Sequence, residues 1–79
     1  MTTLYTRTNK QTNEVTTLTF GEAVDQFIID NLHYASEEDA MTVEEALGDM
    51  STVFESQSML KALLIGDTAD AGHFIYTRI

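Results

Sequence analysis

The chain has 79 residues, no cysteine, and 13 acidic against four basic residues, which gives a formal net charge of −9 at pH 7. This length provides for one domain, residues 1–79, and the absence of cysteine excludes disulfides and thiolate metal sites. Four cations are too few for the phosphate contacts of direct nucleic-acid binding, so the charge instead favours a partner with a basic protein surface.

The first twenty residues are expected to form a β-hairpin. Threonine, a residue that favours strands, occurs eight times in residues 2–19. Side chains alternate in residues 4–7 and again in residues 15–20, and the polar residues 8–13 separate the two segments. This pattern predicts two antiparallel strands joined by a turn, whose type no Asn-Gly pair specifies.

A helix is expected from about Phe20 to Tyr34. Thr19 and Glu22 have the spacing of a capping box at its start. Ile29 lies off the apolar stripe of this helix, so either another element covers it or a partner contacts it. The stripe itself consists of four residues at helical spacing, Val24, Phe27, Ile28 and Leu32.

The acidic middle of the chain has two alternative helix starts. Ser36 can cap a helix whose first turn holds three carboxylates, and Thr42 with Glu45 again has capping-box spacing. Gly48 weakens the end of this second helix. Its apolar stripe consists of Ala40, Val43, Leu47 and Met50.

A third helix is expected to restart at Ser51 or Thr52. Residues 59–65 are apolar at every position except Lys61, and a segment that is apolar all round is usually buried on most sides. We therefore expect burial of three leucines, by the domain or by a second copy of the chain. These residues are Leu60, Leu63 and Leu64.

The C-terminal part is expected to contain a loop at residues 67–72 and a strand at residues 73–79. The segments Leu-Tyr-Thr-Arg-Thr at 4–8 and Ile-Tyr-Thr-Arg-Ile at 75–79 are near copies, which predicts that they are antiparallel neighbours. The chain as a whole is expected to be α+β: a β-hairpin, two to three helices and a C-terminal strand. The helices would pack on one face of a three-stranded antiparallel sheet.

An acidic face is expected if residues 37–50 are helical. Glu45 and Asp49 are then one turn apart on the side away from the apolar stripe, and Glu38 is two turns earlier. No lysine or arginine lies one turn away, and like charges at this spacing cost about 0.2–0.5 kcal/mol per pair. This favours a basic partner, although acidity that serves only solubility remains an alternative. The candidate partner-binding residues are Glu22, Ile29, Glu37, Glu38, Glu44, Glu45 and Asp49.

No residue set indicates catalysis, a metal or another cofactor. Asp30, His33 and Glu37 have helical spacing, but one histidine with scattered carboxylates is not a zinc set. His73 has no nucleophile motif beside it. Residues 1–10 do not resemble a signal peptide, and the longest apolar run is too short to span a membrane. We expect a soluble cytoplasmic protein without enzymatic activity.

The short length, the lack of cysteine and proline, and a middle from Gln11 to Leu60 without lysine or arginine form one pattern. Together with the compact α+β order, it resembles the small acidic proteins that bacteriophages use against host defences, notably anti-CRISPR proteins. These share no common motif, so no site residue is carried over. The resemblance implies an inhibitor in the host cell cytoplasm that acts as a DNA mimic on a CRISPR effector subunit or another nuclease.

A second hypothesis comes from a different class of protein. In it the chain is a homodimeric structural or regulatory module, antitoxin-like or an accessory protein. The third helix is then the contact surface, and the acidity provides solubility alone.

Overall fold

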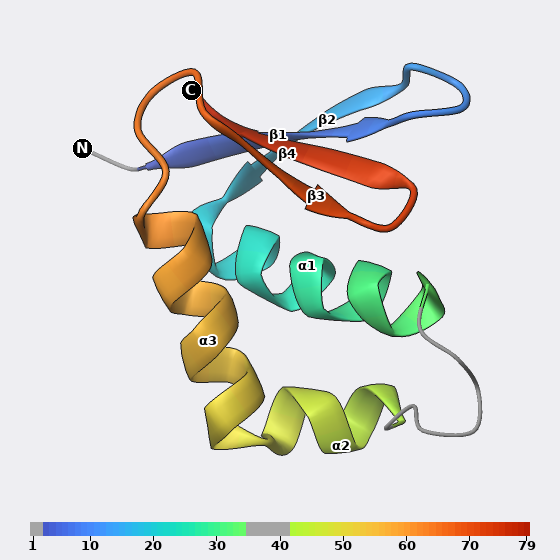
Figure 1. The fold of residues 1–79 in the computed structure, drawn as a ribbon, viewed down its shortest axis with the longest axis vertical. Helices are drawn as coiled ribbons and strands as arrows, with labels where there is room; N and C mark the ends of the chain where they lie inside the picture. The colour runs from blue at the N-terminus through green and yellow to red at the C-terminus, as the bar shows by residue number, and fades with distance from the viewer. Residues whose placement is uncertain (1–2, 35–41) are drawn as a thin grey trace.

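The computed structural model describes residues 3–34 and 42–79, which form an antiparallel sheet and three helices (Figure 1). The strands pair in the order β2-β1-β4-β3. The α+β class expected from the sequence is confirmed. The elements in chain order are β1 (Leu4–Asn9), β2 (Val15–Thr19), α1 (Phe20–Tyr34), α2 (Val43–Gly48), α3 (Met50–Lys61), β3 (Thr68–Ala71) and β4 (Phe74–Arg78).

The pairing expected between the two near-identical segments is confirmed. β1 and β4 are antiparallel neighbours at the centre of the sheet, with Tyr5 opposite Arg78 and Arg7 opposite Tyr76. Because side chains alternate along a strand, these four residues lie on one face of the sheet. α1 crosses this face, and both tyrosines are buried beneath it.

The sheet has a fourth strand, so the expectation of three strands with a loop at residues 67–72 was wrong. β3 pairs with β4 through the two-residue connection Gly72-His73. Gly72 has φ +62, as the first loop position of a type II′ turn requires. Alanine and aspartate are poor strand formers, so residues 68–71 carried no propensity signal. The sequence signal for this hairpin was Gly72, which is followed by His73 and then by the alternating segment of β4.

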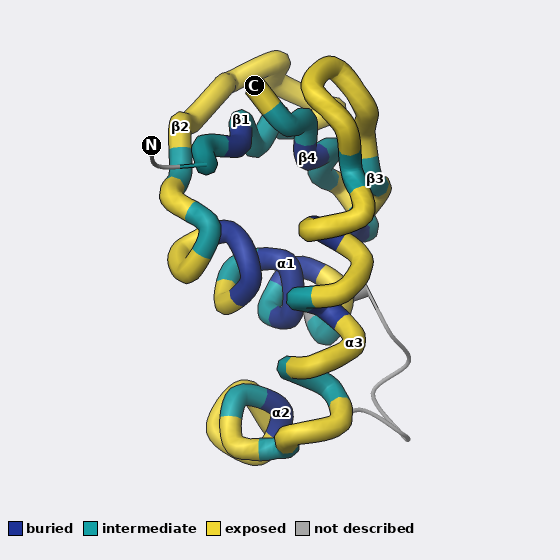
Figure 2. Tube along the Cα trace, turned by 90° about the vertical axis from the view of Figure 1, so that its left-hand side faces the viewer, coloured by how far each residue is buried: buried dark blue, intermediate teal, exposed yellow. Residues whose placement is uncertain are grey.

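The first helix has the expected bounds, capping box and apolar stripe. The Glu22 carboxylate accepts a hydrogen bond from the Thr19 backbone N–H at 3.0 Å, and the Thr19 hydroxyl accepts one from the Glu22 N–H at 3.4 Å. Its stripe residues Val24, Phe27 and Ile28 are buried against the sheet. Figure 2 shows that buried positions gather in α1 and the sheet, whereas α2 and α3 are mostly exposed.

The acidic segment does not continue as one helix to residue 50, which corrects the expectation of a helix over residues 37–50. α2 starts after Thr42, the second of the two proposed starts, whose hydroxyl accepts from the Glu45 N–H at 3.1 Å. Asp49 has extended backbone angles, φ −84 and ψ 108, and separates α2 from α3. The first proposed start, Ser36, lies outside the described residues.

Of the three leucines expected to be buried, one is fully buried. Leu60 is 0% exposed, and Leu63 is half-buried against the core. Leu64 is 69% exposed, so the domain itself does not bury it, and its burial by a second copy stays a prediction. The domain leaves Leu64 exposed because α3 ends at Lys61, which places Leu64 beyond the helical face that was assigned to the core.

Candidate protein-binding surface

The first five residues of α3 expose two large apolar side chains. Met50 is 85% exposed and Phe54 is 71% exposed. They are four residues apart on α3, so their side chains lie together on one helical face. This corner of the fold lies far from the sheet, on the other side of α1 (Figure 1).

A groove of about 280 Å³ runs between the two helices beside these side chains. A second, more open hollow adjoins it, because Met50 and Phe54 line both. Glu55 contributes to the second hollow. The groove is lined by Leu47, Gly48, Met50, Val53, Phe54 and Gln57.

Four carboxylates lie on the same two helices and at their junction, and one of them, Glu55, lines the second hollow. Glu44 and Glu45 are exposed on α2, Asp49 joins the helices, and Glu55 is exposed on α3. Within residues 3–34 and 42–79, the ion pairs are Arg7–Asp30 and Lys10–Asp70, so no described cation neutralises any of the four. We call this surface the α2–α3 corner, defined by Glu44, Glu45, Asp49, Met50, Phe54 and Glu55.

The structure brings only some of the sequence-based candidates together. Glu44, Glu45 and Asp49 meet at the α2–α3 corner, while Glu37 and Glu38 lie outside the described residues. Glu22 caps the start of α1, which adjoins the other end of α3: the Lys61 ammonium lies 5.6 Å from the ring centroid of Phe20. Residues 56–61 of α3 therefore lie between Glu22 and the corner.

Ile29 lies outside the α2–α3 corner, and two residues of the corner, Met50 and Phe54, lie differently from what the sequence indicated. Ile29 is half-buried on α1. Met50 was expected on the apolar stripe of the second helix, but it is the first residue of α3 and is 85% exposed. Phe54 was expected beside the apolar face of the third helix, because residues along that helix are apolar on several sides and helical spacing alone does not select the buried side. The break at Asp49 was the missing information, since it sets the rotation of α3 independently of α2.

No protein-family model, curated protein or solved structure matches this chain. The interpretation of the α2–α3 corner therefore depends on its own geometry and charge.

Asp49 also has a structural role at this corner. Its carboxylate accepts hydrogen bonds from the Ser51 backbone N–H at 3.2 Å and from the Thr52 hydroxyl at 2.8 Å. It is thus the N-cap of α3, and its charge lies at the positive end of that helix. The cap fixes the direction in which α3, with Met50 and Phe54, leaves α2.

We expect Asp49→Ala to lower the free energy of unfolding by about 1 kcal/mol, because α3 loses its N-cap. Asp49→Asn is the matched variant, since asparagine caps helices as well as aspartate does while removing the charge. Chemical denaturation followed by circular dichroism measures both. Equal stability of Asp49→Ala and the unaltered protein would contradict the capping role.

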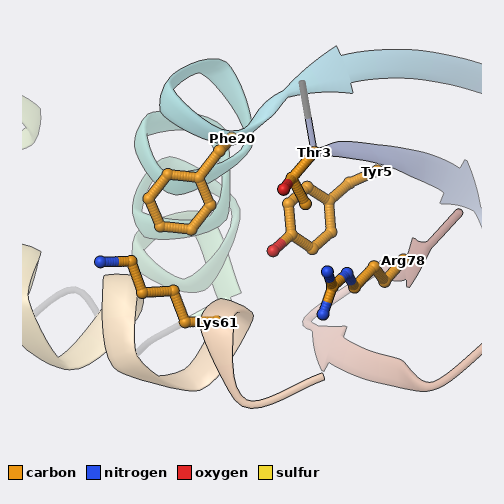
Figure 3. Close-up of a pocket in the computed structure, with 5 residues that line it drawn as sticks. All are labelled: Thr3, Tyr5, Phe20, Lys61 and Arg78. Carbon is orange, nitrogen blue, oxygen red and sulfur yellow. The ribbon is translucent and has the colours of Figure 1, made fainter. Parts of the chain in front are cut away.

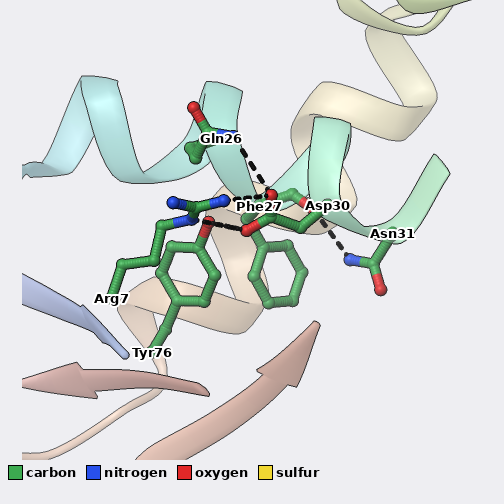
Figure 4. Close-up of polar contacts among 6 residues, drawn as sticks. All are labelled: Arg7, Gln26, Phe27, Asp30, Asn31 and Tyr76. Carbon is green, nitrogen blue, oxygen red and sulfur yellow. Dashed lines mark hydrogen bonds and ion pairs between the residues drawn. The ribbon is translucent and has the colours of Figure 1, made fainter. Parts of the chain in front are cut away.

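A second polar site lies inside the molecule, between α1 and the sheet (Figure 4). Asp30 is 3% exposed. One of its oxygens accepts from Arg7 Nη2 at 2.7 Å and from Gln26 Nε2 at 3.0 Å. The other accepts from Arg7 Nε at 2.8 Å and from the Tyr76 hydroxyl at 2.6 Å. Four donors use the full acceptor capacity of the carboxylate, so this network connects elements rather than offering a reactive group.

The network shifts the pKa values of its members. Burial alone would raise the pKa of Asp30, but the hydrogen bonds from Arg7, Tyr76 and Gln26 outweigh burial and hold it below its usual value. Burial, reinforced by the hydrogen bond to Asp30, raises the pKa of Tyr76. Arg7 is further held by the Phe74 ring, whose centroid is 3.5 Å from the guanidinium carbon. The sequence had indicated Asp30 only as a weak metal-ligand candidate.

The described residues contain neither a metal-ligand cluster nor a membrane-spanning helix. No three or more His, Cys, Asp or Glu side chains among them are grouped as a metal ion would require. None of the helices in residues 3–34 and 42–79 combines the length and the hydrophobicity that crossing a bilayer demands.

Proposed function

We propose that the protein is a non-enzymatic inhibitor that binds a nucleic-acid-handling complex of a host defence system, as anti-CRISPR proteins do. The α2–α3 corner is the contact surface. Its partner is a basic protein surface that normally receives nucleic acid. One observation carries the proposal: an exposed phenylalanine and methionine lie on the same pair of helices as four carboxylates that have no described cationic partner.

The two kinds of side chain have different roles in this mechanism. Phe54 and Met50 provide apolar area that becomes buried on binding, and aromatic side chains commonly dominate the binding energy of interfaces. Glu44, Glu45 and Glu55 take the places of phosphates opposite lysine and arginine. They also steer the encounter, so the association rate is expected to fall as salt is added. Direct competition with nucleic acid for the same site then inhibits the complex.

The second candidate, a homodimeric module, is also supported by the exposure of Phe54, since an exposed aromatic beside a groove suits a second copy of the chain. The acidic residues favour the first candidate. Two copies that meet at this corner would bring their carboxylates close together, which opposes association at low salt. A sedimentation measurement at micromolar concentration distinguishes a monomer from a dimer.

The proposal predicts that Phe54→Ala, and separately the pair Glu45→Lys with Glu55→Lys, abolish inhibition. Neither Glu45 nor Glu55 has a described side-chain ion pair, so we expect the fold to survive. The assay is target-DNA binding by purified CRISPR effector complexes, with each variant added in excess. Truncating a central aromatic anchor commonly costs about 2 kcal/mol or more, which is roughly a 30-fold loss of affinity.

The matched control is the pair Glu14→Lys with Asp25→Lys. Both residues are exposed, and the pair changes the net charge by the same amount at a distance from the corner. We expect this control to inhibit as the unaltered protein does. If both pairs lose inhibition equally, total charge rather than the α2–α3 corner determines binding. If Phe54→Ala and the Glu45/Glu55 pair both inhibit normally, the proposal is wrong.

A further inference from the structure

A hollow of about 220 Å³ lies at the opposite end of α3 from the α2–α3 corner (Figure 3). The first and last residues of α3 are about 16 Å apart along its axis. Four elements and the residue before β1 meet around the hollow, so segments from both ends of the chain build it. Its lining residues are Thr3, Tyr5, Phe20, Lys61 and Arg78.

The charge of this hollow is opposite to that of the rest of the molecule. Lys61 and Arg78 are two of only four basic residues, and no acidic residue lines the hollow. Among the described residues, neither cation forms an ion pair. Arg78 donates a hydrogen bond from Nη1 to the Leu63 carbonyl at 2.7 Å. Its buried Nε has no hydrogen-bond partner among the described residues.

The other walls of the hollow are aromatic. The rings of Tyr5 and Phe20 have centroids 6.1 Å apart, and the Lys61 ammonium lies 5.6 Å from the Phe20 centroid. The Tyr5 hydroxyl is occupied, because it donates to the Leu60 carbonyl at 2.9 Å. Tyr5 is only 1% exposed, so the half-buried Phe20 ring provides the apolar face of the hollow. Lys61 and Arg78 line the hollow from α3 and β4. The Lys61 side chain is exposed, and its ammonium is turned away from Arg78 (Figure 3).

We propose that this hollow binds a small organic carboxylate with an apolar body. The apolar part would lie against Phe20, and the carboxylate would accept hydrogen bonds from Arg78 and from Lys61, whose exposed side chain turns toward the hollow on binding. A bare inorganic anion would leave the Phe20 ring in contact with water. Drug-sized ligands occupy pockets of roughly 300–1,000 Å³, so a ligand of about the size of benzoate matches this smaller volume.

The test is a titration of the full chain with benzoate, followed by the amide signals in two-dimensional NMR spectra. We expect shifts that saturate and that map to the five lining residues. Benzamide, a neutral molecule of the same shape, should bind about tenfold more weakly or worse, because it has no negative charge to pair with the two cations. Lys61→Met should weaken benzoate by about tenfold or more, and Arg78→Lys should also weaken it, because lysine lacks the planar fork of arginine.

Lys10→Met is the matched control, because it makes the same change of charge on the β1–β2 turn, and it should leave benzoate affinity unchanged. N-acetylphenylalanine tests the second source of this chemistry, the carboxylate at the end of a peptide. Tighter binding of benzoate would identify a free small acid as the ligand, and tighter binding of N-acetylphenylalanine would identify the carboxylate end of a peptide. Equal binding of benzoate and benzamide, equal affinity of Lys61→Met and the unaltered protein, shifts with inorganic phosphate alone, or no shifts at millimolar concentrations would each overturn the proposal.

Discussion

Replacing Asp30 with alanine is expected to lower the free energy of unfolding by about 3–5 kcal/mol. The change leaves the guanidinium of Arg7 without its carboxylate and the buried hydroxyl of Tyr76 without an acceptor. Small domains have total stabilities of only about 5–15 kcal/mol, so this loss is a large part of the total. Urea denaturation followed by circular dichroism measures the loss.

Asp25→Ala is the control for this variant, because Asp25 is an exposed aspartate on the same helix. We expect its effect on the free energy of unfolding to stay within about 0.5 kcal/mol.

The dependence of stability on acid provides an independent check of the Asp30 network. The folded-state pKa of Asp30 lies below the ordinary value of 3.8, so its contribution to stability is complete above that pH and is lost as the pH falls through the lowered value. Asp30→Ala should therefore lose less stability below pH 3.8 than the unaltered protein does. The same acid dependence in both proteins would show that the network contributes nothing.

Leu60→Ala is expected to destabilise the protein by about 2–5 kcal/mol. Leu60 is completely buried in the core, so truncating its side chain would open a cavity where α3 packs against α1. The hydrogen bond from the Tyr5 hydroxyl is to the backbone carbonyl of Leu60, which alanine retains. The midpoint of thermal unfolding should fall by several degrees for each kcal/mol lost in a domain of this size.

The chain offers a matched control four residues further on. Leu64 has the same side chain but is 69% exposed, so Leu64→Ala should change stability by no more than about 0.5 kcal/mol. A large loss for Leu64→Ala would mean that a second copy of the chain covers this residue in solution. In that case the loss should depend on protein concentration.

Most of the regular elements could be predicted because their signals are local. The capping box at Thr19 and the stripe beyond it specify α1 within a few residues of sequence. The pairing of β1 with β4 could be predicted for a different reason. Residues 4–8 and 75–79 are near copies with the same alternation of side chains, so both segments place the same residue types on the same face of a sheet. β3 could not be predicted, because a short segment of alanine and aspartate becomes a strand only through its pairing with β4.

The candidate sites were predictable in charge but not in geometry. The acidic residues of α2 were evident from their spacing, whereas the exposure of Phe54 depends on the break at Asp49. The network around Asp30 joins residues that are 23 and 46 positions apart, and no local pattern specifies such contacts. The hollow between Lys61 and Arg78 likewise exists only after the ends of the chain meet.

The order of the strands has a consequence for the nascent chain on the ribosome. β1 and β4 are the central strands, yet β4 begins 70 residues after the start of β1. At roughly 5–20 residues per second, β1 waits several seconds before its second partner emerges. During that time it has a free edge that can pair with another chain. The emergence of β4 closes this edge and supplies the Tyr76 hydroxyl to Asp30, so the last strand made completes both the sheet and its attachment to α1.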